Sequence, residues 1–272
     1  MQTCAANVKV VNVPSYPSPG AEEASVIYAV GDIHGRLDLL ISIEEVIADD
    51  LAKSNAGKAI VCYLGDYIDR GPQSAQVVDQ LLQNSSLGAA KIFLRGNHED
   101  RLLDFLSDPA SNAAAFLSLG GRATLSSYGV AFEEIVKLND WQMLRDHLLS
   151  AMPAGHLEFF KALRLAFVWK EYLFVHAGVH PDNPLEAQYA RDLIWIREPF
   201  LSSEKRWDYR VVHGHVIVPY PDFRSNRIGI DTGAEKTGKL TCLVISKNEC
   251  RILQVTANNL APAPSNSPSS PQ

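Results

Sequence analysis

Short apolar runs alternate with helical patterns along the first part of the chain. Three runs read as buried strands because they are short, apolar and rich in β-branched or aromatic side chains: residues 25–30, 59–64 and 91–94. Between the first two runs, apolar side chains recur at helical spacing, at Leu40, Ile43, Ile47 and Leu51. The next helices are predicted over residues 74–82 and 99–106. This order predicts a parallel β-α-β-α-β unit with right-handed crossovers.

The middle and the second half of the chain show other patterns. Residues from about 109 to 165 are rich in Ala, Leu and Glu at helical spacing, which predicts a mostly helical insert. Six short β-prone runs follow and predict a second sheet: residues 166–170, 172–175, 210–212, 227–230, 240–245 and 251–255. The whole pattern predicts an α/β fold, a four-layer α/β/β/α sandwich of two mixed sheets with a helical insert.

The two ends of the chain differ in composition from this central part. Residues 1–24 combine small polar residues with Pro14, Pro17, Pro19 and Gly20, which predicts a loose N-terminal arm. Residues 259–272 hold too few apolar side chains to offset the entropy of ordering, which predicts a disordered tail. We therefore expect one catalytic domain over residues 25–258, with the helical insert inside it.

Composition and charge exclude several classes of protein. A hydrophobic fraction of 46% and a charged fraction of 21% are typical of a folded globular chain. The net charge of -6 offers no broad basic surface, so neither nucleic acid nor a membrane is expected as a partner. Without an apolar leader or a run of about 20 apolar residues, a cytoplasmic location is expected by default. The cysteines show no C-x-x-C pairing and are expected to be reduced, buried thiols: Cys4, Cys62, Cys242 and Cys250.

Three polar loops follow the three strand-like runs of the first half. They read Gly-Asp-Ile-His-Gly from residue 31, Gly-Asp-Tyr-Ile-Asp-Arg-Gly from residue 65 and Gly-Asn-His-Glu from residue 96. Because the carboxyl ends of parallel strands lie along one edge of a sheet, these loops should converge there. In the second half, His176 and His215 also follow strand-like runs and are candidates for the same place.

Such a gathering of carboxylates and imidazoles is unfavourable unless a cation is present. Like charges raise carboxylate pKa values, and unpaired buried polar groups carry a desolvation penalty. The candidate ligands are imidazole, carboxylate and amide without thiolate, which suits manganese, iron or zinc better than magnesium. The pattern therefore predicts a site for divalent metal.

The motifs GDxHG, GDYxDRG and GNHE, in this order, resemble the phosphoprotein phosphatase family within the calcineurin-like metallophosphoesterases. The segments Leu193–Glu198, Gly214–His215 and Ile230–Ala234 are similar to bacterial and phage members. The resemblance covers about residues 26–246 and is specific, because several separate motifs agree in order. Metallophosphoesterases often end in GHxH, whereas Ile217 stands in the last position here. That departure favours the phosphatase family over the nuclease and cyclic-nucleotide branches.

The resemblance implies a centre of two divalent metal ions, with manganese expected and iron or zinc as alternatives. Asp32 and His34 would bind the first ion, and Asp66 would bridge both. The second ion would be bound by three further side chains: Asn97, His176 and His215. A hydroxide that bridges the two ions would then attack the phosphate directly, without a phosphoenzyme.

The resemblance also implies roles for residues around the metals. His98 would protonate the leaving oxygen, and Asp69 would hold its imidazole in orientation. Arg70 and Arg197 would bind the phosphate, since guanidinium matches it bidentately. Two further residues complete the expected substrate-binding set: Arg95 and Asn97.

Other polar residues receive structural interpretations or open alternatives. Three histidines are expected outside the site, two on the surface of the insert and one in a loop: His147, His156 and His180. His213 lies two residues before His215 and is left as a less favoured alternative ligand. Asp231 is expected either to line the rim of the site or to cap a turn. Trp195 is expected to pack beneath Arg197.

These patterns predict a metal-dependent serine/threonine phosphoprotein phosphatase that hydrolyses phosphomonoesters. Its expected partners are a phosphoprotein or phosphopeptide, with small phosphoesters also accepted. Two alternatives stay open. One is a diadenosine-polyphosphate hydrolase of the same superfamily, which shares the first three motifs, although Asp69 and Glu99 favour the phosphatase. The other is a phospho-binding protein without catalysis.

Overall fold

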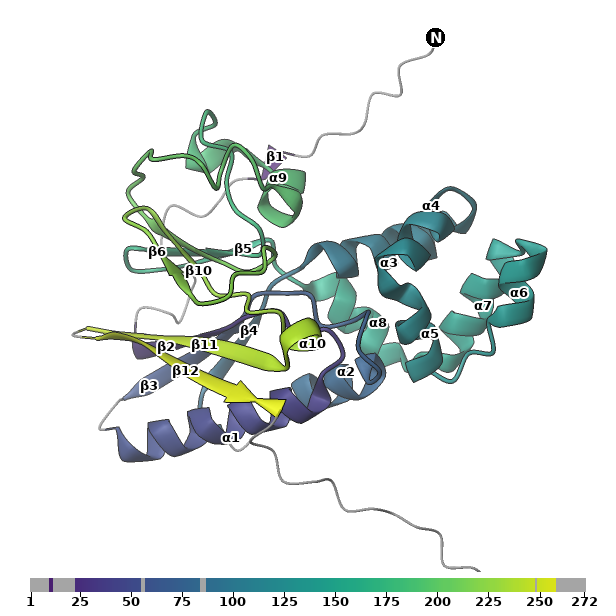
Figure 1. The fold of residues 1–272 in the computed structure, drawn as a ribbon, viewed down its shortest axis with the longest axis horizontal. Helices are drawn as coiled ribbons and strands as arrows, with labels where there is room; N and C mark the ends of the chain where they lie inside the picture. The colour runs from purple at the N-terminus through teal and green to yellow at the C-terminus, as the bar shows by residue number, and fades with distance from the viewer. Residues whose placement is uncertain (1–9, 12–22, 55–56, 84–86, 248, 258–272) are drawn as a thin grey trace, which may run out of the picture.

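Two five-stranded sheets face each other in the left half of the view in Figure 1. The structure is a computed structural model, and it describes residues 10–11, 23–54, 57–83, 87–247 and 249–257. The strand orders of the two sheets are β12-β11-β2-β3-β4 and β5-β6-β8-β10-β9. Helices cover their outer faces, so the predicted α/β fold with four layers and two mixed sheets is confirmed.

The first sheet begins with the parallel unit predicted from the first half. Its parallel strands are β2 (Ala24–Val30), β3 (Lys58–Tyr63) and β4 (Ala90–Phe93). The helices that follow these strands are α1 (Leu37–Lys53), α2 (Ser74–Leu82) and α3 (Asn97–Ser107). In Figure 1, α1 and α2 lie on the face of this sheet that points away from the second sheet. Each strand therefore ends in a loop that leads into a helix, as the motif spacing predicts.

The C-terminal hairpin corrects one prediction. Residues 240–245 and 251–255 were expected in the second sheet, but β11 (Lys239–Ser246) and β12 (Cys250–Thr256) belong to the first. β11 pairs antiparallel with β2, with Leu243 opposite Ala29. The burial of both faces of β11 explains why it lies in the first sheet. Cys242 packs in the core on the helix side, and Leu243 packs in the core between the two sheets. A strand that is buried on both faces needs a sheet on one side and helices on the other.

The second sheet is built from five short strands. Its inner strands run parallel, and they are β6 (Tyr172–Val175), β8 (Arg210–His213) and β10 (Arg227–Gly229). The edge strands run antiparallel to their neighbours, and they are β5 (Ala166–Trp169) and β9 (Asp222–Phe223). The outer face carries α9 (Ala190–Trp195), and the short helix α10 (Ala234–Thr237) leads into β11. Phe167, Phe174 and Ile228 fill the space between the two sheets.

A short strand lies among the described residues of the N-terminal arm. Residues 10–11 form β1 (Val10–Val11), which pairs antiparallel with β7 (Gln188–Tyr189) just after the 3-10 turn η2 (Leu185–Ala187). The arm predicted as a loop is therefore a strand at this point. The predicted tail over 259–272 lies outside the described residues, as does Cys4. The division into arm, catalytic domain and tail stays a prediction.

Helices fill residues 109–162 and stand to one side of the sheets (Figure 1). They are α4 (Pro109–Phe116), η1 (Leu117–Gly121), α5 (Arg122–Ser127), α6 (Glu133–Leu138), α7 (Trp141–Ala151) and α8 (Ala154–Ala162). The Asp108 and Asp140 side chains cap the first turns of α4 and α7 by accepting backbone N–H groups. The chain kinks at Gly120, where φ is 111°. We call residues 109–162 the insert.

Two side chains lie elsewhere than expected. His156 is buried rather than on the surface, because its ring bonds Tyr128 (2.8 Å) and Asp79 (3.0 Å) between α8 and α2. Polar neighbours in the sequence gave no sign of this packing. Cys250 is exposed at the start of an edge strand, whereas Cys62 and Cys242 are buried, as predicted. Burial raises the pKa of both buried thiols.

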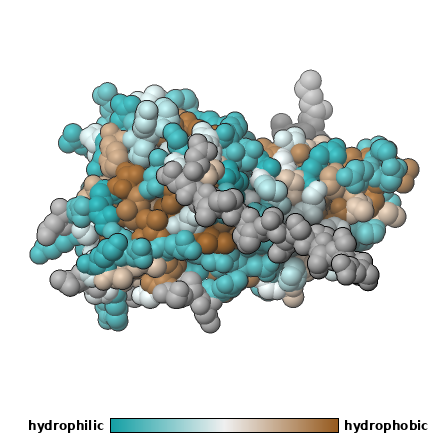
Figure 2. Space-filling view, turned by 60° about the horizontal axis from the view of Figure 1, so that its bottom comes forward, coloured by the Kyte–Doolittle hydropathy of each residue, from teal (hydrophilic) through white to brown (hydrophobic). Residues whose placement is uncertain are grey.

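The surface is mixed in polarity. Figure 2 shows a face on which hydrophilic side chains predominate and apolar ones gather in the half that holds the sheets. Within the described ranges, no helix combines the length and the apolar character needed to cross a bilayer. The cytoplasmic location stays a prediction.

Candidate metal centre

The loops after β2, β3 and β4 meet at one edge of the first sheet, as their positions after parallel strands require. Strained backbone marks this place. In the described part of the chain, seven non-glycine residues have positive φ, and five of them are predicted site residues: His34 (46°), Asp66 (52°), Asp69 (70°), Arg70 (66°) and His215 (64°). Left-handed backbone is costly for such residues and tends to persist at functional sites.

Asp66 lies at the centre of two groups of potential metal ligands. One group joins it to His34 and His98, and the other joins it to His176 and His215, with all ligand atoms of each group within 4.8 Å of one another. Its Oδ2 lies 3.5 Å from His34 Nε2, and its Oδ1 lies 3.4 Å from His176 Nε2. The two oxygens of one carboxylate therefore face two different groups.

Hydrogen bonds of His34 and His176 determine which ring nitrogen carries the proton and which does not. His34 Nδ1 donates to the Ile68 carbonyl and His176 Nδ1 donates to the Leu64 carbonyl, both at 2.9 Å. Burial lowers the pKa of His34 to about 3 and also lowers the pKa of His176, so both rings are neutral. Each Nε2 is therefore unprotonated, and its lone pair points towards the Asp66 carboxylate.

Asn97 brings a third acceptor to the His176 side. Its Oδ1 lies 3.0 Å from His176 Nε2 and 2.9 Å from His215 Nδ1. Burial lowers the pKa of His215 to about 3, and its Nε2 has no hydrogen-bond partner among the described residues. Bare nitrogens and acceptor oxygens that face one point repel each other unless a cation lies between them. The donor set therefore fits a divalent metal.

Asp32 lies beside these two groups rather than within them. It is buried, and its Oδ2 accepts the backbone N–H of His215 at 3.0 Å. Burial, followed by the nearby Asp231 and Asp66 carboxylates, raises the pKa of Asp32 well above its ordinary value. A crowded acid of this kind is relieved by a cation.

Burial would also raise the pKa of Asp66, but its surroundings reverse the direction. At the low pH at which Asp66 would take up a proton, the four surrounding imidazoles, led by His176, are protonated as well. Their charge outweighs burial and lowers the pKa of Asp66 below its ordinary value. The shared carboxylate is therefore ionised and available as a ligand.

Two glycines let the backbone approach these carboxylates. A Cβ at Gly96 would lie 2.1 Å from Asp66 Oδ1, and a Cβ at Gly214 would lie 2.1 Å from Asp32 Oδ1. Any other residue would displace a predicted ligand, so these motif glycines are needed for close approach as well as for turning.

His98 is oriented by Asp69. Its Nδ1 donates to Asp69 Oδ2 at 2.8 Å, and both side chains are fully buried. Burial alone would lower the pKa of His98, but the Asp66 and Asp69 carboxylates outweigh it and raise the pKa above its ordinary value. A histidine held in this way can carry a proton to a nearby oxygen.

The three predicted arginines occupy different surroundings. Arg70 donates to His34 Nε2 at 3.0 Å and to His98 Nε2 at 2.9 Å, which places its guanidinium over the site. Arg197 is exposed, and its charge contributes to the lowered pKa of His215. Arg95 is not brought to the site by its bonds, because it pairs with Asp100 at 3.8 Å and donates to a carbonyl of α8.

Trp195 lies near the site but not as predicted. The guanidinium of Arg101, rather than that of Arg197, lies over its ring at 4.9 Å. The edge of the indole approaches His215, with the ring centres 6.5 Å apart. Trp195 therefore packs between α3 and the metal centre.

The structure decides between the alternatives that the sequence leaves open for His213 and Asp231. His213 belongs to neither ligand group, because its ring packs against Phe200 at 5.1 Å and burial lowers its pKa to about 4. Asp231 accepts the Gly233 N–H at 2.8 Å, and its carboxyl lies beside Asp32. It both shapes a turn and lines the centre. His147 is exposed and His180 lies in a loop, as predicted.

Two residues that support the site were not assigned such roles from the sequence. Glu99 accepts the backbone N–H groups of Asp66, Tyr67 and Gly96 at 2.7–2.9 Å, which joins the second and third loops. Its place in the third motif was the signal for it. Thr124 of the insert donates to Asp69 Oδ1 at 2.5 Å. No pattern in the sequence marks a threonine that lies 55 residues from its partner.

Comparison with known proteins gives relatives with different activities. The chain is 24% identical over 234 residues to bis(5'-nucleosyl)-tetraphosphatase PrpE of Anoxybacillus flavithermus, covering 79% of this chain and 88% of the relative. It is 27% identical over 226 residues to serine/threonine-protein phosphatase 2 of Salmonella typhimurium, covering 79% and 90%. The predicted resemblance to phosphoprotein phosphatases is therefore confirmed, while the substrate differs between these relatives.

Solved structures and a family model agree on the fold. A protein proposed to be a diadenosine tetraphosphatase aligns with a TM-score of 0.62 at 22% identity, covering 90% of this chain and 98% of that one. A cold-active protein tyrosine phosphatase aligns with a TM-score of 0.53 at 15% identity, covering 91% and 87%. The model of the calcineurin-like phosphoesterases matches residues 25–242. Because that match includes all the loops of the metal centre, the chain belongs to the calcineurin-like phosphoesterase family.

Proposed function

We propose that this phosphoesterase is a metal-dependent serine/threonine phosphoprotein phosphatase. The observation that carries the proposal is the His98–Asp69 pair, with a 2.8 Å hydrogen bond, in which His98 contacts the Arg70 guanidinium and belongs to the ligand group of Asp66 and His34. Removal of phosphate from serine or threonine leaves a strongly basic alkoxide, which needs a proton. A buried histidine held by a carboxylate is suited to supply it.

The residues of the centre fit two divalent cations, with manganese expected and iron or zinc as alternatives. Asp32 and His34 would hold one, Asp66 would be shared, and the other would be held by Asn97, His176 and His215. When bound, such a pair lowers the pKa of water and neutralises charge on the phosphoryl oxygens. The support for this assignment is the pair of unprotonated imidazole nitrogens that face the Asp66 carboxylate from both sides, together with the amide oxygen of Asn97.

The remaining roles follow from position. Water adds to phosphorus as the bond to the leaving oxygen breaks. His98 would give a proton from Nε2 to that oxygen, once Nε2 is protonated and the Arg70 guanidinium has moved from it to the phosphoryl oxygens. Arg70, whose guanidinium lies within 3.0 Å of two site histidines, would bind the phosphoryl oxygens. Arg197 would approach them from the exposed side, near His215, and Asn97 would be a further substrate-binding residue. Arg95 would bind substrate only after leaving its contact with Asp100, so it is the weakest member of the set.

A second candidate is a hydrolase of dinucleoside tetraphosphates. It is favoured by the PrpE relative, which is named for that activity and whose identity to this chain is similar to that of the phosphatase relative. The ligands and His98 would serve either substrate, because in both reactions water attacks a phosphorus atom and a P–O bond breaks.

Product analysis separates the two candidates. The manganese-loaded full chain would be incubated with a serine phosphopeptide and, separately, with diadenosine tetraphosphate, and the products would be resolved by ion-exchange chromatography. We expect a higher kcat/KM for phosphate release from the peptide. A higher kcat/KM for dinucleotide cleavage would replace the proposed function with the second candidate. Binding of the peptide without hydrolysis of either substrate would indicate a phospho-binding protein.

A further inference from the structure

The insert reaches the metal centre through one side chain, Thr124 of α5. Its hydroxyl donates to Asp69 Oδ1 at 2.5 Å and accepts the Asp69 backbone N–H at 3.0 Å. The other oxygen of the same carboxylate accepts from His98. Thr124, Asp69 and His98 thus form one chain of hydrogen bonds, and all three are fully buried.

Thr124 contacts Asp69, a residue with an unusual backbone conformation. Asp69 and Arg70 both have left-handed backbone, with φ values of 70° and 66°. Such a conformation persists only where the surroundings hold it. Ser74 supplies a second acceptor for the Asp69 N–H at 3.0 Å, but it begins α2, the helix that directly follows the loop of Asp69. Thr124 is the holding group that comes from the insert.

The insert also contacts Arg70, at its kink. The carbonyl of Gly120 accepts the Arg70 N–H at 3.4 Å, and a Cβ at Gly120 would lie 2.9 Å from that nitrogen. Gly120 itself has a φ of 111°. The chain therefore bends at a residue without a side chain, at the point where it touches the loop that carries Asp69 and Arg70.

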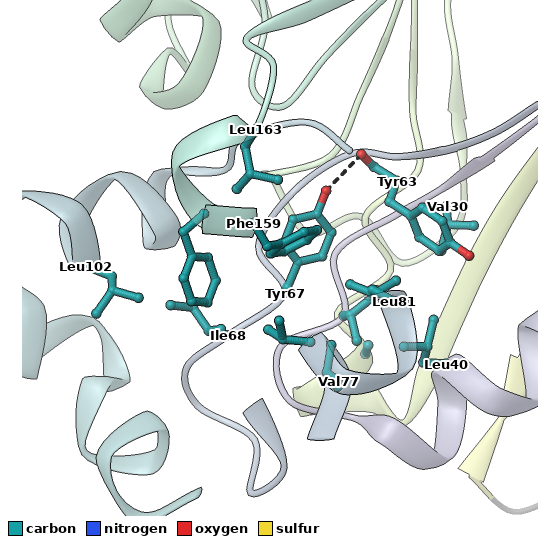
Figure 3. Close-up of a cluster of buried hydrophobic side chains, with 14 of the residues drawn as sticks. Val30, Leu40, Tyr63, Tyr67, Ile68, Val77, Leu81, Leu102, Phe159 and Leu163 are labelled. Atoms are coloured by element: carbon teal, nitrogen blue, oxygen red, sulfur yellow. Dashed lines mark hydrogen bonds between the residues drawn. The ribbon is translucent and has the colours of Figure 1, made fainter. Parts of the chain in front are cut away.

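Apolar packing fixes the insert against the same loop from another helix. Figure 3 shows Phe159 of α8 beside Tyr67, with Leu163 close by, and the two ring centres are 5.6 Å apart. The Tyr67 hydroxyl donates to the Leu94 carbonyl at 2.7 Å. The buried rings keep the insert at a fixed distance from the loop, which the Thr124 hydrogen bond requires.

We propose that Thr124 is a positioning residue, through which the insert holds Asp69 and thereby the His98 imidazole in the orientation needed to protonate the leaving oxygen. The inference rests on the proposed function in assigning that proton to His98. It gives the insert a part in the chemical step in addition to any contact with substrate.

Leaving groups of different basicity test this role. Thr124→Val keeps the shape of the side chain and removes the hydroxyl. A serine phosphopeptide leaves a basic alkoxide that needs the proton, whereas p-nitrophenyl phosphate leaves a weakly basic phenolate that does not. We expect kcat for the peptide to fall about tenfold more than kcat for p-nitrophenyl phosphate, a part of the roughly 100- to 10,000-fold typical of general acid catalysis. Equal losses for both substrates would overturn the proposal.

The matched control is Thr124→Ser, which keeps the hydroxyl and should restore the wild-type ratio of the two activities. If the serine variant shows the same selective loss as the valine variant, the hydroxyl is not the cause and the proposal is wrong. An inactive wild-type protein would instead count against the proposed function.

A readout without turnover keeps these outcomes apart. In zinc-loaded protein, the NMR signal of the His98 Nδ1 proton should be slow to exchange with water, and Thr124→Val should make it exchange at least several-fold faster. Zinc is chosen because manganese is paramagnetic and would broaden the signal. An unchanged exchange rate in the valine variant would show that Thr124 does not hold the Asp69–His98 pair.

Discussion

On one flank of the metal centre, Asp69 and His98 are fully buried and hydrogen-bonded to each other and to the insert. On the opposite flank, Arg197 is exposed and makes no ion pair or side-chain hydrogen bond within the part of the chain that the structure describes. The first flank is fixed before substrate arrives, as a proton donor must be. The second can adapt to what binds, so the choice between substrates is expected to lie there.

Asp66 is shared by both flanks, and its replacement should have the largest effect. Asp66→Asn replaces one ligand oxygen by an amide nitrogen that cannot bind metal, so both metal positions should be weakened and activity should be lost. Elemental analysis of the dialysed protein together with a phosphatase assay measures both. Asp146→Asn, at an exposed position of the insert, is the matched control. Retention of both metals in the Asp66 variant would contradict its shared role.

His98→Asn isolates the buried flank. Turnover of a serine phosphopeptide should fall by about 100- to 10,000-fold, because the proton donor is removed, while metal content stays nearly unchanged. His147→Asn, an exposed histidine of the insert, should leave both unchanged. Loss of metal from the His98 variant would mean that His98 is a ligand, and the two flanks would then not differ as described.

Arg197→Ala tests the exposed flank. We expect KM for the phosphopeptide to rise about tenfold, the low end for a charge-assisted hydrogen bond, because water screens this side. The fall in kcat should be smaller. Arg191→Ala is a suitable control, since Arg191 is also exposed and precedes the same segment. Unchanged KM values for both variants would show that substrate does not use this flank.

The smallest expected effect concerns how the buried flank is held. Gly120 and Gly129 both have positive φ, but a Cβ at Gly129 would meet nothing within 4 Å. Gly129→Ala should lower the free energy of unfolding by about 1 kcal/mol through backbone strain alone. Gly120→Ala should lower it by about 1–3 kcal/mol more, because the new methyl group meets Arg70. Urea denaturation followed by circular dichroism measures the difference, and equal losses would show that the approach to Arg70 is not tight.

Local sequence patterns predicted the parts of the molecule that depend on neighbours along the chain. Three strands, each followed by a polar loop and a helix, place Asp66 and His98 at one edge of a sheet. The placement of β11 was missed, because an apolar run shows that a strand is buried but not which strand it pairs with. His156 was missed for a similar reason, since its partner Asp79 lies 77 residues away.

The same limit applies to the candidate site. Motif order was enough to bring together His34, Asp66 and Asn97, because each follows its own strand. Thr124 stands in an ordinary helical pattern, and only the folded insert brings its hydroxyl to Asp69. Arg95 lies next to a motif, yet its contacts point to Asp100 and α8. Proximity in sequence to a site is therefore a poor guide for long, flexible side chains.

The kink at Gly120 sets a rule for engineering. An α-helix turns about 100° per residue, so adding or deleting one residue between Gly120 and Thr124 would rotate the threonine away from Asp69. Beyond α5, the helices α6 and α7 are free of that requirement. A library that shortens, lengthens or replaces α6 and α7 while leaving residues 120–124 intact should therefore keep the proton donor aligned.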